Sequence, residues 1–277
     1  IAPADSIFYG IRSETSTVDS IPLIAASIMS KKLAAGPEGL VLNVTTGNGA
    51  FMKQEDQARE LAEAMVGIAL ASGLQASSVI SRMDQPLAPF VGNALEIQQA
   101  VRLLRGETVP GTERFVEVAI ALATETLIHG GVFTADQREE AAQAVRDKLA
   151  SGQAADKFRQ MVEAQEGDPR IVDDLSRLPQ AATIVEIRAP SSGTISQIDS
   201  EAVGWAAVFL GGGRQREDDP IDPAVGIEVL GFLGDQVQEG DVIARFAVND
   251  ESGVDRARAR FLAAYTIGDD AVDVPDQ

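Results

Sequence analysis

The sequence contains no cysteine, one histidine and five lysines among its 277 residues. Without cysteine, the chain has no disulfides, no thiolate catalysis and no thiolate metal sites. The single histidine, His129, leaves few candidates for a general acid or base near neutral pH. No apolar run reaches the roughly 20 residues that a membrane-spanning helix needs. We therefore expect no membrane partner, and a cytoplasmic location is the default expectation.

Positive charge is also scarce, because 42 acidic residues face 23 basic ones and the net charge is −19. Nucleic acids and anionic membranes are bound through basic patches, so this charge argues against both as partners. An anionic substrate such as phosphate would need a local cationic pocket. With 45% hydrophobic and 23% charged residues, the composition is typical of a globular chain with a sizeable core and more than one domain.

The densest group of candidate residues lies between Arg12 and Lys32, in RSETSTVDSIPLIAASIMSKK. This stretch holds an arginine, a Ser/Thr-rich turn and a predicted helix on which Ser27 and Lys31, four residues apart, share one face. A guanidinium, a hydroxyl and an ammonium suit a flat ligand with carbonyl oxygens and an N–H, above all when negative charge develops on it. The alternative is a solvated helix end, where the macrodipole favours Lys31 and Lys32.

Apolar periodicity divides the chain into two regions. Up to residue 178, strand–helix–strand order predicts a parallel sheet covered by helices, an α/β arrangement. Beyond it, short β-like runs alternate with Gly, Pro and Asp turns and two helices. We expect the boundary within DDLSRLPQ, residues 173–180. The expected strands are 39–47, 77–84, 182–190, 192–199, 226–232 and 241–248, and the expected helices after the first are 54–73, 93–105, 115–129, 135–151, 154–166, 201–211 and 251–265.

Five long strings resemble the pyrimidine-nucleoside phosphorylase family, which includes thymidine phosphorylase. They are TVDSIPLIAASIMSKKLAAG, GNGAFMK, SRMDQPLAPFVGNALE, KFRQMVEAQEGDP and IDPAVG, in this order along the chain. The resemblance implies the C-terminal part of a central α/β domain over residues 1–178, with an incomplete parallel sheet. A small α+β domain of barrel-sandwich hybrid type would follow over 179–277. We expect the chain to lack the N-terminal third of such proteins.

The resemblance also implies an activity, a pentosyltransferase reaction. Phosphate would cleave the N-glycosidic bond of thymidine or uridine to give the free base and a pentose 1-phosphate. In the related enzymes an arginine, a serine and a lysine hold the pyrimidine ring, and the matching positions are Arg12, Ser27 and Lys31. Arg12 and Lys31 would stabilise negative charge on the leaving base, while Ser27 would orient the ring.

In the family the phosphate site lies in the part that we expect to be missing. We therefore expect no phosphate-binding residue in this chain, which by itself should be inactive, and a homodimer for the full-length protein. Two alternatives stay open. One is a non-catalytic pyrimidine-binding fragment or divergent homologue, and the other is a structural protein that keeps only the fold.

The loop GNGAF is a weaker candidate for binding phosphate. A glycine-rich turn between a strand and a helix can cradle phosphate, but this loop lacks the GK[ST] ending of a P-loop. We favour a structural role for Gly47 and Gly49. Just before them, Asn43, Thr45 and Asn48 depart from the family pattern, which carries an acid and a lysine there.

A potassium site is the remaining candidate and the one cofactor that the resemblance suggests. Some relatives bind potassium through two backbone carbonyls after MDQPL and an acid further on. The matching positions are Leu87, Phe90 and Gln99, and a neutral glutamine weakens such an oxygen site without abolishing it.

His129 ends an apolar helix before two glycines, where we expect it to cap carbonyl groups.

Overall fold

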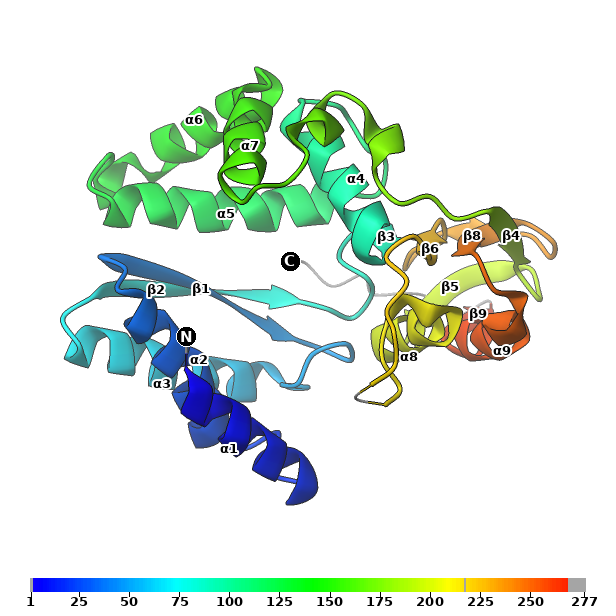
Figure 1. Ribbon diagram of the computed structural model, residues 1–277, viewed down its shortest axis with the longest axis horizontal. Coiled ribbons are helices and arrows are strands. Elements are labelled where there is room, and N and C mark those ends of the chain that lie inside the picture. The colour runs from blue at the N-terminus through cyan, green and yellow to red at the C-terminus, as the bar shows by residue number, and fades with distance from the viewer. Residues whose placement is uncertain (1, 217, 269–277) are drawn as a thin grey trace. The chain divides into compact units, whose positions relative to one another are not determined.

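The computed structural model describes residues 2–216 and 218–268, which divide into two compact units (Figure 1). The first unit comprises residues 2–83 and 117–145, and the second comprises residues 84–116 and 146–268 apart from 217. This division differs from the expected boundary after residue 178. The reason is a short strand at Phe90–Val91, which pairs with Gly226–Val229 and so joins residues 84–116 to the second unit. The domain boundary taken from the sequence stays a prediction.

The first unit contains a two-stranded parallel sheet with helices on both sides. Strands β1 and β2 pair from Gly39 opposite Gln75 to Thr46 opposite Arg82, and α3 connects them. Figure 1 shows α2 and α3 on one side of the sheet and α5 on the other. The elements are α1 (Pro3–Glu14), α2 (Ile21–Ala35), β1 (Gly39–Thr46), α3 (Glu55–Ala71), β2 (Gln75–Arg82) and α5 (Glu113–His129), which begins in the second unit.

Alanine and methionine dominate the core of the first unit. One buried cluster includes Ala25 and Met29 of α2, Leu42 and Val44 of β1, and a stripe along α3. The stripe follows helical spacing: Ala58, Leu61, Ala62, Met65 and Ala69. Small side chains let α2 and α3 lie close together, and this packing fixes the face of α2 that points away from the core.

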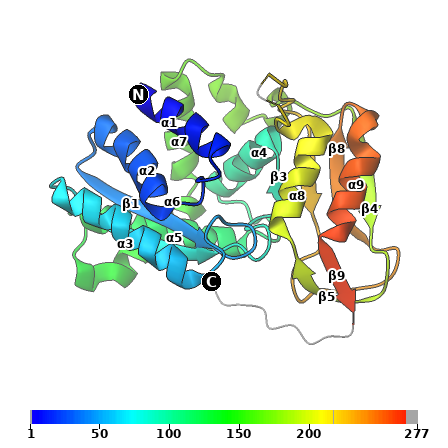
Figure 2. The same cartoon turned by 90° about the horizontal axis from the view of Figure 1, so that it is seen from below.

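The second unit combines a helical part with two antiparallel sheets. One sheet has the order β3-β6-β8-β4 and the other has the order β7-β5-β9. Figure 2 shows α8 and α9 side by side next to these strands. The helices are α4 (Asn93–Leu104), α7 (Gln153–Ala164), α8 (Ser200–Ala207) and α9 (Val254–Ala263). Helix α6 (Arg138–Ala150) begins in the first unit and ends in the second. The strands are β3 (Phe90–Val91), β4 (Thr183–Arg188), β5 (Gly193–Ile198), β6 (Gly226–Val229), β7 (Gln236–Val237), β8 (Val242–Val248) and β9 (Tyr265–Gly268).

Branched and aromatic side chains fill the core of the second unit. Phe246 of β8 and Phe261 of α9 are fully buried and meet edge to face, with ring centroids 5.5 Å apart. Tyr265 continues the stack at 4.9 Å from Phe261, and its hydroxyl donates to the Gly231 carbonyl. Burial raises the pKa of the Tyr265 phenol, which therefore stays neutral and can act as this donor.

The expected parallel strand pair and the expected helices are confirmed. The expected strands are confirmed as well, with end points that shift by a few residues. In the described part of the chain, one α-helix (α1) and three strands (β3, β7 and β9) were not predicted, nor were the 3₁₀ helices at Pro169–Val172 and Leu175–Arg177. Two of these strands have only two residues, too few for a periodic signal, and the last expected helix was drawn through Tyr265 although α9 ends at Ala263. No helix in the described part of the chain is both long enough and apolar enough to cross a membrane.

Candidate functional site

The turn between α1 and α2 is built around Arg12, whose side chain is only 5% exposed. Its guanidinium donates to the carbonyl oxygens of Thr17 at 3.4 Å and Leu23 at 3.3 Å, and also to that of Val18. Three of its five N–H donors therefore hold the start of α2 against the end of α1. The prediction that Arg12 binds a ligand is not tested by this geometry, which leaves two donors for such a role.

Ser27 and Lys31 meet on one face of α2, as their spacing predicts. The helix begins after Ser20, with a proline in its first turn, and ends at Gly36, which adopts a left-handed conformation with φ of 67°. The Lys31 ammonium nitrogen donates to the Ser27 hydroxyl oxygen at 3.0 Å. Lys32 is exposed, in agreement with the interpretation that it is solvated.

The structure adds Asp5 to this pair. The Lys31 ammonium lies 2.5 Å from a carboxylate oxygen of Asp5, which reaches over from α1. Hydrogen bonding from Lys31, and then from Ser27, lowers the pKa of Asp5 below its ordinary value of 3.8. The carboxylate is therefore ionised at neutral pH and fixes the position of the ammonium. Sequence reasoning missed Asp5 because it did not predict α1.

Tyr9 is a second addition from α1. The Arg12 guanidinium lies over its ring, 5.4 Å from the ring centroid, within cation–π range. The cluster of Asp5, Tyr9, Arg12, Ser27 and Lys31 thus combines an aromatic ring with two cations, a hydroxyl and one carboxylate. The ammonium and the hydroxyl can hydrogen-bond the polar edge of a flat heterocycle.

The glycine loop after β1 uses its own N–H groups internally. The Gly47 N–H donates to the Met52 carbonyl at 3.2 Å, and the Gly49 N–H donates to the Met83 carbonyl at 2.9 Å. Because both donors are engaged, the loop matches the structural interpretation better than a phosphate cradle. Asn43, one of the departures from the family pattern, accepts a hydrogen bond from the buried Ser81 hydroxyl at 2.9 Å.

Gln99 in α4 has a buried oxygen without a partner. Its side chain is 4% exposed, and no donor among the described residues reaches Oε1. Such an orphaned acceptor costs about 1–3 kcal/mol unless something compensates it. A cation is one compensating group, so this observation fits the oxygen ligand that the resemblance implies at position 99.

The Phe90 carbonyl takes no part in the pairing of β3 with β6. Val229 donates to the Pro89 carbonyl at 2.7 Å, and Phe90 stands opposite Glu228 in the antiparallel pair of β3 and β6. Hydrogen-bonded and non-hydrogen-bonded pairs alternate in such a ladder, so the Phe90 carbonyl points away from β6. Within residues 2–216 and 218–268, no cluster of three or more acidic or histidine side chains forms a separate metal site.

His129 makes a different contact from the expected one. Its Nε2 lies 2.9 Å from the Ser77 hydroxyl of β2, and no carbonyl cap is formed by its ring among the described contacts. Ser77 also lies 3.4 Å from a Glu125 carboxylate oxygen, and Arg138 pairs with Glu125. The histidine therefore ties the end of α5 to the sheet, which is a structural role.

The fold, an α/β unit followed by a small mixed domain, agrees with the class of protein that two family models describe. Residues 2–155 match the family model described as "Glycosyl transferase family, a/b domain", and residues 194–268 match "Pyrimidine nucleoside phosphorylase C-terminal domain". The chain belongs to this glycosyl transferase family. The resemblance to the pyrimidine-nucleoside phosphorylases that the sequence motifs indicated is thereby confirmed.

Three relatives show how far the similarity extends. Pyrimidine-nucleoside phosphorylase of Bacillus subtilis strain 168 is 43% identical over 252 residues, covering 91% of this chain and 57% of the relative. Thymidine phosphorylase of Burkholderia orbicola strain MC0-3 is 39% identical over 270 residues, 97% of this chain and 61% of the relative. Pyrimidine-nucleoside phosphorylase of Geobacillus stearothermophilus is 40% identical over 275 residues, 99% and 62% respectively. The chain thus spans about three fifths of the length of these relatives.

Proposed function

We propose that this chain carries the pyrimidine-binding part of a pyrimidine-nucleoside phosphorylase that accepts thymidine or uridine together with inorganic phosphate. One observation carries the proposal. Within a domain of the matching family, the Lys31 ammonium on α2 is held by Asp5 at 2.5 Å and by Ser27 at 3.0 Å. An ammonium fixed in this way is preorganised to stabilise the negative charge that develops on the leaving base.

The chemistry follows from the charge that the base acquires. As the C1′–N1 bond of the nucleoside breaks, the electron pair goes to the pyrimidine and spreads onto its carbonyl oxygens, while a phosphate oxygen bonds to C1′. Lys31 stabilises this charge more strongly in the transition state than in the ground state, which accelerates the step. Ser27 orients the ring, and the remaining N–H donors of Arg12 lie within the same cluster to add positive potential.

Several further features belong to this proposal. They are a homodimeric assembly, a cytoplasmic location and a role in nucleoside salvage, which the resemblance implies. The names of the relatives support the reaction type, since these proteins are called pyrimidine-nucleoside phosphorylase and thymidine phosphorylase. The alternative is a protein that binds pyrimidines without catalysis.

Two measurements test the function. Titration of the chain with thymine should show a binding component that is lost in the Lys31→Ala variant. Because this chain by itself should be inactive, an assay for phosphate-dependent release of thymine from thymidine by the full-length protein then separates a phosphorylase from the non-catalytic alternative, in which binding persists without any release. If no Lys31-dependent binding of thymine is found, both the phosphorylase function and the non-catalytic pyrimidine-binding alternative are contradicted.

Potassium is a further part of the proposal. The ion would be held by the carbonyl oxygens of Leu87 and Phe90 and by the orphaned Oε1 of Gln99, and it would tie the middle of α4 to the segment before the helix. In thermal unfolding, potassium chloride should stabilise the chain more than sodium chloride does. The Gln99→Leu variant should lose this difference, and an equal response of the unaltered chain to both salts would contradict the site.

A further inference from the structure

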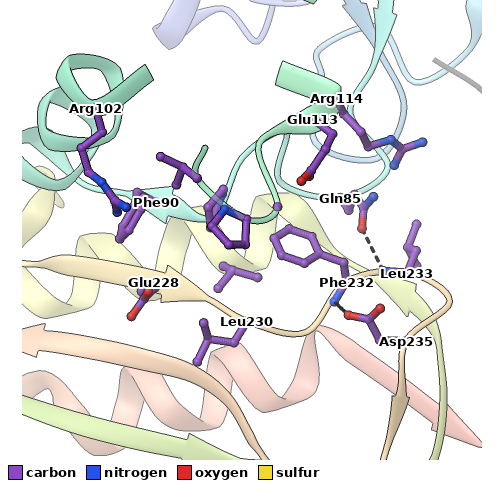
Figure 3. Close-up of a pocket in the computed structure, with 15 residues that line it drawn as sticks. Gln85, Phe90, Arg102, Glu113, Arg114, Glu228, Leu230, Phe232, Leu233 and Asp235 are labelled. Atoms are coloured by element: carbon purple, nitrogen blue, oxygen red, sulfur yellow. Dashed lines mark hydrogen bonds between the residues drawn. The ribbon is translucent and has the colours of Figure 1, made fainter. Parts of the chain in front are cut away.

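A cavity of about 550 Å³ lies within the second unit, apart from every residue assigned above to the base cluster. It opens between the segment that contains Gln85 and Arg114 and the chain from Glu228 to Asp235, as Figure 3 shows. Its volume falls in the range of about 300–1,000 Å³ that is typical of small-molecule sites. The apolar part of its lining consists mainly of Pro89, Phe90, Val109, Pro110, Leu230 and Phe232.

The Phe232 ring is fixed in this wall. Gly111 has φ of 80°, and a Cβ built on it would lie 3.1 Å from the ring of Phe232, so glycine is what allows the close approach. The backbone of Phe232 is also held in a tight turn, where its N–H donates to the Asp235 carboxylate at 2.8 Å and its carbonyl accepts from the Asp235 N–H at 3.1 Å. The cavity therefore presents a flat aromatic surface in a set orientation.

Gln85 supplies a fixed polar group. Its side chain is 5% exposed, and its Oε1 accepts a hydrogen bond from the Leu233 N–H at 2.8 Å. Figure 3 shows this bond, with the amide nitrogen on the other side of the group. No acceptor among residues 2–216 and 218–268 makes a hydrogen bond with Nε2. A largely buried amide N–H₂ is thus left to donate to a ligand.

Three of the charged side chains that line the cavity are engaged with other residues. Arg102 pairs with Glu107 at 3.0 Å, and Glu228 pairs with Arg245 at 3.1 Å. Arg114 also has a partner. Glu113 also lines the cavity, and no hydrogen bond or ion pair of its carboxylate occurs among the described residues. The cavity therefore offers an aromatic face, one oriented neutral donor and one carboxylate, a combination that disfavours an anionic ligand.

We propose that this cavity binds a planar heterocycle that carries a ring carbonyl. The ring would stack on Phe232, where an aromatic pair contributes about 0.5–1.5 kcal/mol beyond burial. The ring carbonyl would accept a hydrogen bond from Nε2 of Gln85. Free nucleobases and nucleosides share this chemistry. The site has no residue in common with the Lys31 cluster, so it stands or falls independently of the proposed phosphorylase function.

The test uses uracil and uridine as probes on the full chain carrying Lys31→Ala, which disables the other cluster. Saturation-transfer NMR should show transfer to uracil in this background. Gln85→Glu keeps an oxygen to accept the Leu233 N–H but replaces the free donor with an acceptor, and it should reduce the transfer at least about fivefold, which is a typical effect of losing one hydrogen bond. Phe232→Leu keeps an apolar side chain, removes the flat ring and should reduce the transfer as well.

Met161→Ala serves as the matched control, because Met161 is an exposed side chain of the same unit that does not line this cavity. It should leave the transfer unchanged. Transfer to uridine as well as uracil would mean that the cavity accepts the sugar, and transfer to uracil alone would mean that it takes free bases. No transfer in the Lys31→Ala chain, or transfer that survives both Gln85→Glu and Phe232→Leu, overturns the proposal. Circular dichroism on each variant confirms that it is folded.

Discussion

The two candidate sites differ in the sequence separation of the residues that form them. The Lys31 cluster comes from one stretch, because Asp5 and Lys31 are 26 residues apart and Ser27 is four from Lys31. The cavity in the second unit is closed by Gln85 and Leu233, which are 148 residues apart. Helical spacing in the sequence predicts the pairing of Ser27 with Lys31. The cavity in the second unit cannot be predicted in this way, because its residues come together only when the chain folds.

The hydrophobic cores of the two units also differ, in the size of the side chains that fill them. The first unit packs alanine and methionine between α2, α3 and the strands, which suits a sheet of two parallel strands covered by helices. The second unit also packs alanine, but together with isoleucine, valine and phenylalanine, between two antiparallel sheets and α8 and α9. Each large side chain buries more apolar area than each small one, so we expect single core substitutions to cost more in the second unit.

The largest expected effect tests that difference. Phe246→Ala should lower the free energy of unfolding by about 3–5 kcal/mol, because it opens a cavity next to Phe261. Met29→Ala should cost about 2–3 kcal/mol, since methionine is flexible and its neighbours can partly fill the space. Urea unfolding followed by circular dichroism measures both.

Phe8→Ala is the control for this pair, because Phe8 is 65% exposed, and it should change the stability by less than about 0.5 kcal/mol. A larger loss for Met29→Ala than for Phe246→Ala would contradict the comparison of the two cores.

A smaller effect concerns the charge on Asp5. Its pKa is lowered in the folded chain, so its contribution to stability is complete above the ordinary value of 3.8 and is lost as the pH falls through the lowered pKa. Between about pH 7 and about pH 3, the unaltered chain should therefore lose more thermal stability than Asp5→Asn does. Because the ion pair is partly solvated, the difference should be modest and should shrink with added salt. Equal losses in the two proteins would show that Asp5 and Lys31 do not interact in solution.

Much of the fold could be predicted because its signals are local. The apolar stripe of α3 and the glycine that ends α2 are visible in the sequence, and so is the spacing of Ser27 and Lys31. The parallel pairing of β1 and β2 follows from strand–helix–strand order. These features depend on neighbours within a few residues, so they need no knowledge of the rest of the chain.

The missed features depend on contacts that no local pattern reveals. The apolar residues of α1, including Ile7 and Phe8, are exposed, so no buried stripe marks this helix, and Asp5 was missed with it. Strand β3 has two residues and exists because β6 pairs with it. The contacts of Arg12 with three carbonyls were also missed, because they follow from a turn whose geometry the sequence does not specify, while its expected ligand role stays a prediction.

The central claim is that the face of α2 that carries Ser27 and Lys31 binds a pyrimidine. Calorimetric titration with thymine of the unaltered chain, Lys31→Ala and Lys32→Ala tests it most directly, because the two variants lose the same charge from neighbouring positions that point about 100° apart. We expect Lys31→Ala to weaken binding by at least about tenfold, typical of a hydrogen bond to a charged group, and Lys32→Ala to leave it nearly unchanged. Equal effects of the two substitutions, or no effect of either, would contradict the account.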